Sequence, residues 1–268
     1  MNTTIKAVIA DLAGTTVDFG SCAPAGVFVE VLRRAGVEIS LADARGPMGM
    51  SKKDHIRELL RLPNVSTAWQ EKHGNDWNER DVEDIYEAFI PLQLECLADY
   101  NELIPGVLET VNLLKSRGIK LGVNTGYTRD MTDIVLDGMK AQGVVPDASC
   151  CYSDVPAGRP APWMIFHTME QLNVCPPCAV VAIGDTLSDI EAGRNAGLWT
   201  VGITRTGNLI GMNAEEVEQA DPEVLASLIE EGSRQLLEKG AHYVVESFTE
   251  LPAIIDVINE RIKTGDRP

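Results

Sequence analysis

Short runs of consecutive apolar residues recur along the chain and predict β-strands. They lie at residues 5–10, 119–123, 179–183, 199–203 and, as a shorter segment, 242–245. Their lack of clean alternation between apolar and polar positions is typical of strands that are covered on both faces of a parallel sheet. The hydrophobic pattern therefore predicts a parallel sheet as the scaffold of the fold.

Helical periodicity fills the intervals between these runs. Residues 106–117, 129–142, 162–172 and 188–196 carry apolar side chains three or four positions apart, as on one face of a helix. Alternating strands and helices predict an α/β core with a doubly wound, Rossmann-like parallel sheet and right-handed crossovers.

Two more amphipathic helices are expected near the C-terminus, at residues 222–239 and 247–261. Ser247 and Glu250 have the spacing of a capping box at the start of the second one.

The first two apolar runs are separated by a long stretch with little strand character. Residues 23–35, 52–60 and 82–99 show helical spacing there, and the stretch is far longer than a usual connection. We therefore expect a helical cap inserted after the first strand. The predicted division is a core of residues 1–20 and 103–268 with a cap of residues 21–102.

Composition and charge narrow the classes of function. Of 268 residues, 44% are hydrophobic, and 23 basic against 40 acidic residues give a formal net charge of −17. A chain this acidic lacks the basic field that binds a phosphate backbone, so we expect no nucleic-acid partner and no anionic membrane surface. A small anionic substrate is compatible, because a metal ion and one or two cationic side chains can reverse the local field.

The N-terminus and the cysteines predict a cytoplasmic protein. The first apolar run ends at the charged Asp11 and is too short for a signal peptide. The sequence also contains no run of about 18 apolar residues, so we expect no membrane span. The six cysteines are then expected to be reduced thiols. Cys175 and Cys178 have zinc-ligand spacing, but without a second such pair ordinary thiols are favoured.

Three carboxylates fall where predicted strands end. Asp11 follows residues 5–10, Asp185 follows residues 179–183, and Asp189 lies four positions further. Ligands collect at the carboxyl ends of strands in open α/β sheets, and Mg²⁺ prefers oxygen ligands. Each residue alone could be a helix cap or a turn former. Together, in register with the sheet pattern, they predict a magnesium site.

These motifs resemble those of the haloacid dehalogenase superfamily. They are D-x-x-G-T-T at residues 11–16, a strand that ends in Thr125 and Gly126, and G-D-x-x-x-D at residues 184–189, with Arg159 between the last two. In that superfamily the first aspartate is a nucleophile that accepts a phosphoryl group, and the later acid helps to bind Mg²⁺. The helical insert matches the cap of its C1-type members.

Ala13 separates this chain from most phosphatases of the superfamily. Those enzymes carry a second aspartate at this position, which protonates the leaving alkoxide. Alanine cannot donate a proton, so ordinary monoester hydrolysis lacks its acid. A carbon leaving group needs an electron sink instead, and a lysine amine that forms a Schiff base with a neighbouring aldehyde provides one.

The cap offers P-M-G-M-S-K-K-D-H at residues 47–55, which is similar to the P-M-G-x-x-K-x-x-H stretch of the phosphonoacetaldehyde hydrolase family. Further similarity lies at residues 13–20, 125–129, 154–160 and 193–202. The resemblance implies Mg²⁺-dependent cleavage of phosphonoacetaldehyde to acetaldehyde and phosphate. It also implies one Mg²⁺ per subunit, a homodimer formed through cap helices, and an upstream transamination of 2-aminoethylphosphonate.

The resemblance assigns roles by position. Asp11 matches the nucleophile and Lys52 the Schiff-base lysine. The metal ligands would be Asp11, the main-chain carbonyl of Ala13, and Asp185, with Thr186 and Asp189 in support. The positions that contact or surround the substrate are matched by Met48, His55, Thr125, Gly126, Tyr127 and Arg159.

Two positions complicate this assignment. Lys53 stands beside Lys52, but the spacing from Gly49, and a spacing to His55 that puts both side chains on one side of a helix, favour Lys52. Leu12 occupies the place of a tryptophan that is usual in the family, so we expect altered packing rather than lost chemistry.

The sequence leaves two rival functions open. One is a Mg²⁺-dependent phosphatase or phosphotransferase acting on a small phosphate ester, against which Ala13 argues. The other is a non-catalytic phosphonate-binding protein, which would need neither a nucleophile at Asp11 nor an amine at Lys52.

Overall fold

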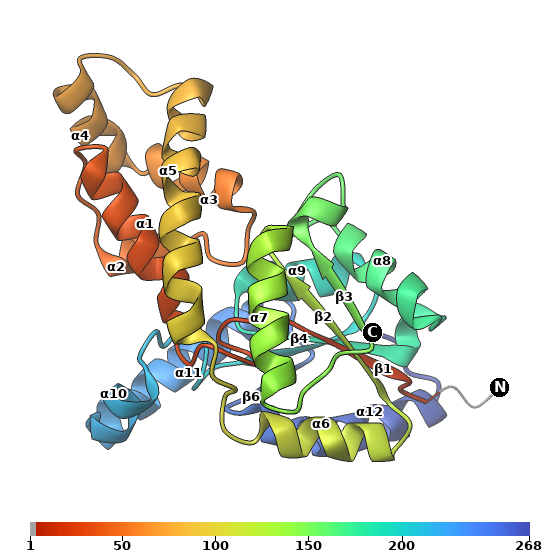
Figure 1. Ribbon diagram of the computed structural model, residues 1–268. Coiled ribbons are helices and arrows are strands. Elements are labelled where there is room, and N and C mark those ends of the chain that lie inside the picture. The colour runs from red at the N-terminus through yellow and green to blue at the C-terminus, as the bar shows by residue number, and fades with distance from the viewer. Residues whose placement is uncertain (1–3) are drawn as a thin grey trace.

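The computed structural model describes residues 4–268 and has a six-stranded sheet at its centre (Figure 1). Its strands are β1 (Ala7–Ala10), β2 (Lys120–Thr125), β3 (Ala148–Cys151), β4 (Val180–Gly184), β5 (Trp199–Ile203) and β6 (Tyr243–Val245). They are all parallel, in the order β3-β2-β1-β4-β5-β6. The order reverses at β1, and ligands bind beyond the carboxyl ends of the strands at such a point.

Helices cover both faces of the sheet. One face is packed by α8 (Trp163–Leu172), α9 (Leu187–Asn195) and α11 (Pro222–Glu238), and the other by α6 (Val107–Ser116), α7 (Arg129–Ala141) and α12 (Leu251–Lys263). In β1, Ala7 and Ile9 face the α8 and α9 side, whereas Val8 and Ala10 face the other core. This double burial explains the uninterrupted apolar run and confirms the predicted fold class.

The helical insert lies between β1 and β2, and forms the upright unit in Figure 1. It contains α1 (Cys22–Arg34), α2 (Leu41–Arg45), α3 (Lys52–Arg61), α4 (Pro63–His73) and α5 (Glu79–Leu97). Phe28 of α1 packs on Phe89 of α5, with ring centroids 4.5 Å apart. The helices predicted for α1, α3 and α5 are therefore present, together with two that the periodicity did not predict.

The apolar pattern missed several short elements. Strand β3 reads A-S-C-C, and its buried Cys150 and Cys151 behave as small apolar residues. Helix α2 is five residues long, and α4 buries only Val65 and Trp69. Helix α10 (Ala214–Gln219) is also short. Such segments are too short or too polar to establish a period.

Asp18 shapes the entry of the chain into the helical insert. Its carboxylate accepts hydrogen bonds from the main-chain N–H groups of Cys22 (3.0 Å) and Ala23 (3.1 Å), at the start of α1. Asp18 and Ser21 both have positive φ, 54° and 50°. The chain thus turns sharply between β1 and α1, and the turn carries α1 away from the sheet.

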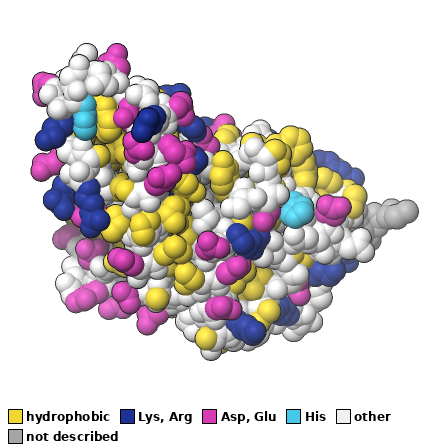
Figure 2. Space-filling view, turned by 45° about the horizontal axis from the view of Figure 1, so that its top comes forward, with side chains coloured by type: hydrophobic (Ala, Val, Ile, Leu, Met, Phe, Trp, Pro, Cys, Tyr) yellow, Lys and Arg dark blue, Asp and Glu magenta, His cyan; other side chains and the backbone are white. Residues whose placement is uncertain are grey.

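The surface agrees with a chain rich in acidic residues. On the face shown in Figure 2, Asp and Glu side chains are interspersed with Lys and Arg rather than separated from them. Within residues 4–268, every helix falls short of the length and apolar character needed to cross a bilayer.

Candidate active site

Asp11 lies at the carboxyl end of the central strand. Its main-chain N–H donates to the carbonyl of Ile183 (3.0 Å), which extends the pairing between β1 and β4 by one residue. The following loop turns back at once, since the hydroxyl of Thr16 donates to the carbonyl of Leu12 (3.2 Å). Gly14 takes a φ of 82° in this turn, which favours glycine. The Asp11 side chain is thereby held over the edge of the sheet.

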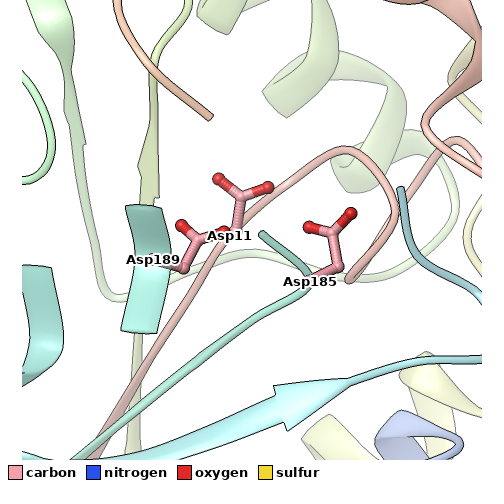
Figure 3. Close-up of side chains that lie close together, drawn as sticks. All are labelled: Asp11, Asp185 and Asp189. Carbon is pink, nitrogen blue, oxygen red and sulfur yellow. The ribbon is translucent and has the colours of Figure 1, made fainter. Parts of the chain in front are cut away.

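Two more carboxylates converge on Asp11, as Figure 3 shows. Asp185 follows β4, and Asp189 lies in the first turn of α9. One oxygen from each of the three buried side chains lies within 4.8 Å of the others. The predicted acidic cluster therefore forms, and Asp189, expected only in support, belongs to it.

Arg159 compensates part of this negative charge. Its guanidinium lies 2.7 Å from Asp11 and 2.8 Å from Asp189, and it also donates to the main-chain carbonyl of Asn124 (3.0 Å). The arginine and both carboxylates are buried. Burial opposes the charged guanidinium, but Asp189 and Asp11 outweigh that effect and raise the pKa of Arg159. Arg159 thus stays cationic beside the Asp11 carboxylate.

The electrostatics of the cluster suit a bound cation. Burial raises the pKa of Asp11 to about 7, against the opposing effect of Arg159. Burial, followed by the charges of Asp11 and Asp189, raises the pKa of Asp185 well above its usual range. Three carboxylates face one guanidinium here, and a hard divalent cation would relieve their repulsion. The all-oxygen donor set fits Mg²⁺, with Asp11 and Asp185 as the side chains that would hold it.

The Asp185 carboxylate is held by residues that sequence reasoning missed. One oxygen accepts from the hydroxyl of Thr15 (3.2 Å) and the other from the main-chain N–H of Asn208 (2.7 Å). A Cβ on Gly14 would lie 2.3 Å from that second oxygen, so only glycine allows the approach. Thr15 belongs to the D-x-x-G-T-T motif at residues 11–16, whereas no sequence motif surrounds Asn208 that would have indicated its contact with Asp185.

Thr186 and Asp189 support the site from the start of α9. The Asp189 carboxylate accepts from the main-chain N–H (3.0 Å) and the hydroxyl (2.5 Å) of Thr186, which closes a capping box. Its other oxygen faces Arg159. Asp189 therefore joins the helix terminus to the guanidinium.

A cavity of about 20 Å³ lies between the acidic cluster and the helical insert. That is roughly the room needed for one water molecule. Of the residues predicted from the sequence, those that line it are Asp11, Ala13, Met48, Lys52, Thr125, Gly126, Tyr127, Arg159 and Thr186. His55, Asp185 and Asp189 lie outside its lining. Core and insert therefore both contribute walls.

Lys52 brings an amine to this cavity from the first turn of α3. Its Nζ lies 4.7 Å from the ring centroid of Tyr127, 5.4 Å from that of Phe28 and 5.7 Å from that of Phe89. Burial lowers the pKa of Lys52 from 10.5 to about 8, although Asp11 and Asp18 oppose the shift. A usable fraction of the neutral amine is thus present near neutrality.

Lys53 points to a different environment. Its Nζ lies 2.6 Å from a Glu83 oxygen and 4.7 Å from the Tyr86 ring centroid. The geometry therefore brings Lys52, and not its neighbour, to the cavity.

His55 lies one turn further along α3 and is buried. Its ring stacks on Phe28 at 3.6 Å, and Nε2 donates to the carbonyl of Ala44 (2.8 Å). Burial, with a smaller effect of Lys52, lowers its pKa well below the usual value. His55 is therefore neutral and backs the aromatic wall around the amine.

Two glycines let the insert approach the core closely. Gly49 has a φ of 87°, and a Cβ there would lie 2.3 Å from the hydroxyl oxygens of both Thr186 and Ser188. A Cβ on Gly126 would lie 2.6 Å from the carbonyl of Met50. The loop before α3 therefore docks directly on α9 and on the end of β2.

Thr125 ends β2 beside that docking point. Its hydroxyl accepts from the main-chain N–H of Tyr127 (3.2 Å), and both residues are buried. The structure thus brings the predicted phosphate-contacting threonine and the predicted tyrosine to one wall.

Comparisons with known proteins agree with this fold and site. The model of the haloacid dehalogenase-like hydrolase family matches residues 5–197, and a related HAD-hydrolase-like model matches residues 156–251. The chain belongs to the haloacid dehalogenase-like hydrolases.

More similar relatives define its place within that class. Phosphonoacetaldehyde hydrolases from Bacillus cytotoxicus and Syntrophobacter fumaroxidans are 45% and 44% identical, over 96% and 98% of this chain and 97% and 95% of theirs. A phosphonoacetaldehyde hydrolase-like protein from Oleispira antarctica has a crystal structure that superposes with a TM-score of 0.97 at 37% identity, covering 98% of this chain and 96% of that one. The chain is a hydrolase of the phosphonoacetaldehyde hydrolase family, which confirms the resemblance found in the sequence.

Proposed function

We propose that this protein hydrolyses the carbon–phosphorus bond of phosphonoacetaldehyde and releases acetaldehyde and phosphate. One observation carries the proposal: the buried amine of Lys52 and the carboxylate of Asp11 line the same small cavity. An amine and a carboxylate that reach one small substrate from opposite sides can act on its aldehyde and its phosphorus. The names of the relatives support the same substrate.

The proposed reaction begins at Lys52. Its neutral amine adds to the aldehyde and loses water, which gives an imine, and the imine nitrogen takes up a proton to become an iminium. Asp11 then attacks phosphorus, and the electrons of the P–C bond move to carbon and the iminium nitrogen, which leaves an enamine on Lys52. Protonation at carbon and hydrolysis of the imine release acetaldehyde. Water hydrolyses the aspartyl phosphate and frees Asp11 for the next cycle.

Charge compensation is the second requirement of the proposed reaction. A bound Mg²⁺ would lower the repulsion between carboxylate and phosphonate as a Lewis acid. Asp11, Asp185 and the main-chain carbonyl of Ala13 are the ligands that we propose, with Thr186 and Asp189 in support. Arg159 adds a fork of N–H donors that suits phosphonate oxygens. Thr125 and Gly126 would complete the phosphonate contacts, and Met48, His55 and Tyr127 the surroundings of the imine.

Borohydride trapping with a variant pair tests this assignment. Lys52→Arg keeps the charge but cannot form an imine, so it should release no acetaldehyde, whereas Lys53→Arg should turn over like the wild type. Borohydride added during turnover should leave an ethyl group on Lys52 in the wild type and in Lys53→Arg. Acetaldehyde release by Lys52→Arg would refute the role of this lysine.

The matched product assay separates the rival functions. Acetaldehyde and phosphate should appear in equal amounts from phosphonoacetaldehyde, and the release should depend on Mg²⁺. Phosphate release from a panel of small monoesters, without acetaldehyde from phosphonoacetaldehyde, would favour the phosphatase. Binding of phosphonoacetaldehyde without either product would favour a binding protein.

The domain division and the assembly state belong to the same proposal. We infer that residues 21–102 move as a cap on the core of residues 1–20 and 103–268, of which residues 1–3 lie outside the described part of the chain. Opening of this cap would admit substrate, since about 20 Å³ is too small for it. We further propose a homodimer through the cap helices, and sedimentation at micromolar concentration would distinguish a dimer from a monomer.

A further inference from the structure

Arg45 is a cationic side chain that the proposed reaction leaves unused. It ends α2, near the end of the helical insert that meets the core (Figure 1). Its guanidinium donates to the carbonyls of Gly20 (2.8 Å) and Gly211 (2.8 Å) and to the side-chain oxygen of Asn208 (3.2 Å). Arg45 therefore forms hydrogen bonds both to the segment that enters the cap, at Gly20, and to a core loop that contains Asn208 and Gly211.

Asn208 links Arg45 to Asp185 through two hydrogen bonds of its own. Its side-chain N–H group donates to the carbonyl of Arg45 (3.1 Å), so the two residues form reciprocal hydrogen bonds. Its main-chain N–H donates to an Asp185 oxygen at 2.7 Å. Asn208 is buried, with 4% of its surface exposed. A continuous series of three residues thus links the cap to the carboxylate at the end of β4.

The core loop that carries Asn208 is shaped for this arrangement. A Cβ on Gly207 would lie 2.5 Å from the Asp185 Cβ, and a Cβ on Gly211 would lie 2.5 Å from the Arg45 Nε. The hydroxyl of Thr206 donates to the carbonyl of Gly14 (2.9 Å), which ties the loop to the turn after Asp11. The loop is therefore pressed between the guanidinium on one side and the acidic cluster on the other.

We propose that Arg45 and Asn208 form a latch through which closure of the cap fixes the Asp185 carboxylate for metal binding. Arg45 is then a positioning residue, because it acts on the metal site through Asn208 and not by contact. This inference rests on the proposed function for the role of Asp185 as a Mg²⁺ ligand. It adds that cap closure and Mg²⁺ binding are coupled, and such a coupling is reciprocal.

Calorimetric titration of Mg²⁺ into metal-free protein tests the latch without any turnover. Arg45→Ala should weaken Mg²⁺ binding about 10- to 100-fold, as loss of a residue that orients a ligand typically does. Asn208→Ala keeps the main-chain N–H to Asp185 but loses the latch, so it should weaken binding to a similar extent. The double variant should bind Mg²⁺ no more weakly than either single one, since the two residues act as one unit.

Arg33→Ala is the matched control, because Arg33 is an exposed cap arginine that pairs with Glu30 on its own helix. It should bind Mg²⁺ like the wild type. Thermal unfolding of each metal-free variant reports a merely structural role, which would lower the unfolding temperature without moving Mg²⁺ affinity. Arg45→Lys should restore affinity only in part, because an ammonium cannot reach three acceptors with a planar fork.

The Mg²⁺ titrations distinguish failure of the latch from failure of the proposed function. Unchanged Mg²⁺ affinity in both Arg45→Ala and Asn208→Ala would overturn the latch, even if the wild type binds Mg²⁺ and cleaves phosphonoacetaldehyde. Additive losses in the double variant would also overturn it, since independent contacts would then explain them. A wild type that binds no Mg²⁺ would remove the metal site itself and the latch with it.

Discussion

Lys52 shows how a single residue acquires chemistry from neighbours that are distant in sequence. The rings around its amine belong to Phe28 of α1, Phe89 of α5 and Tyr127 after β2. The motif favoured Lys52 over Lys53, and Lys52 is the one that lines the cavity. The lowered pKa of Lys52 arises from burial among segments that meet only in the folded chain. The contact of Asn208 with Asp185 also forms only in the folded chain, and no local pattern in the sequence indicates it.

The buried amine has a cost for stability that depends on pH. The pKa of Lys52 falls from 10.5 to about 8 on folding, so between these values the unfolded chain binds more protons than the folded one. The free energy of unfolding therefore rises with pH across this window. Lys52→Met removes the charge but keeps an unbranched apolar stem, and should stabilise the protein at pH 7 by up to about 3 kcal/mol.

Urea denaturation at pH 7 and pH 10 checks this prediction. The advantage of Lys52→Met should shrink at the higher pH, because the wild-type amine is then neutral in the fold. Lys53→Met should change stability by less than about 1 kcal/mol, since it loses a partly exposed ion pair with Glu83 and a contact of the ammonium with the Tyr86 ring. A Lys52→Met variant that is less stable than the wild type at pH 7 would contradict the argument.

At the scale of elements, the hydrophobic pattern of the sequence predicted the helices that are long and the strands that are continuously apolar. Strands β1, β2, β4 and β5 follow their runs closely. The capping box of Ser247 and Glu250 forms, but it caps the 3-10 turn Phe248–Glu250 that precedes α12 rather than α12 itself. Of the elements that the pattern missed, β3, α2 and α10 are short, whereas α4 is 11 residues long but buries only Val65 and Trp69. The sequence pattern also did not predict the docking of the loop before α3, because this docking depends on the close approach of Gly49 to α9.

Gly49→Ala tests that docking. The residue has a φ of 87° and would place a Cβ against two hydroxyl oxygens. Alanine would strain the backbone by about 1–2 kcal/mol and also hold the loop away from α9. We expect loss of most activity towards phosphonoacetaldehyde, at a modest cost in unfolding temperature.

Gly74→Ala separates the two effects. Gly74 ends α4 with a φ of 77°, and a Cβ there would meet nothing within 4 Å. This variant should show a similar loss of stability with normal activity. Equal activities of the two variants would mean that docking of the loop is not needed for the reaction.

At the scale of the whole molecule, the acidic site stores electrostatic repulsion that folding must overcome. Asp11, Asp185 and Asp189 are buried together with one guanidinium. A ligand that binds only the folded chain stabilises it in proportion to the logarithm of its concentration. Mg²⁺ should therefore raise the unfolding temperature progressively, and a chelator should reverse the rise.

Asp185→Asn gives the matched comparison. The amide can accept from the main-chain N–H of Asn208 and donate to the Thr15 hydroxyl, so it keeps both contacts without the charge. The metal-free variant should unfold at a higher temperature than the metal-free wild type, because burial of the carboxylate is unfavourable. Mg²⁺ should then raise the unfolding temperature of this variant only slightly. A full Mg²⁺ response in Asp185→Asn would exclude this residue as a ligand.

The origins of Lys52 and Asp11 have a mechanical consequence. Lys52 belongs to α3 of the helical insert, whereas Asp11 follows the central strand of the core. In the proposed reaction, the substrate is attached to one of them through carbon while the other bonds to its phosphorus. At that moment it is a covalent tether between the two halves of the enzyme. Scission of the P–C bond cuts the tether, leaving the carbon fragment with the insert and the phosphoryl group with the core. The chemical step itself would thus sort the products and free the two halves to separate.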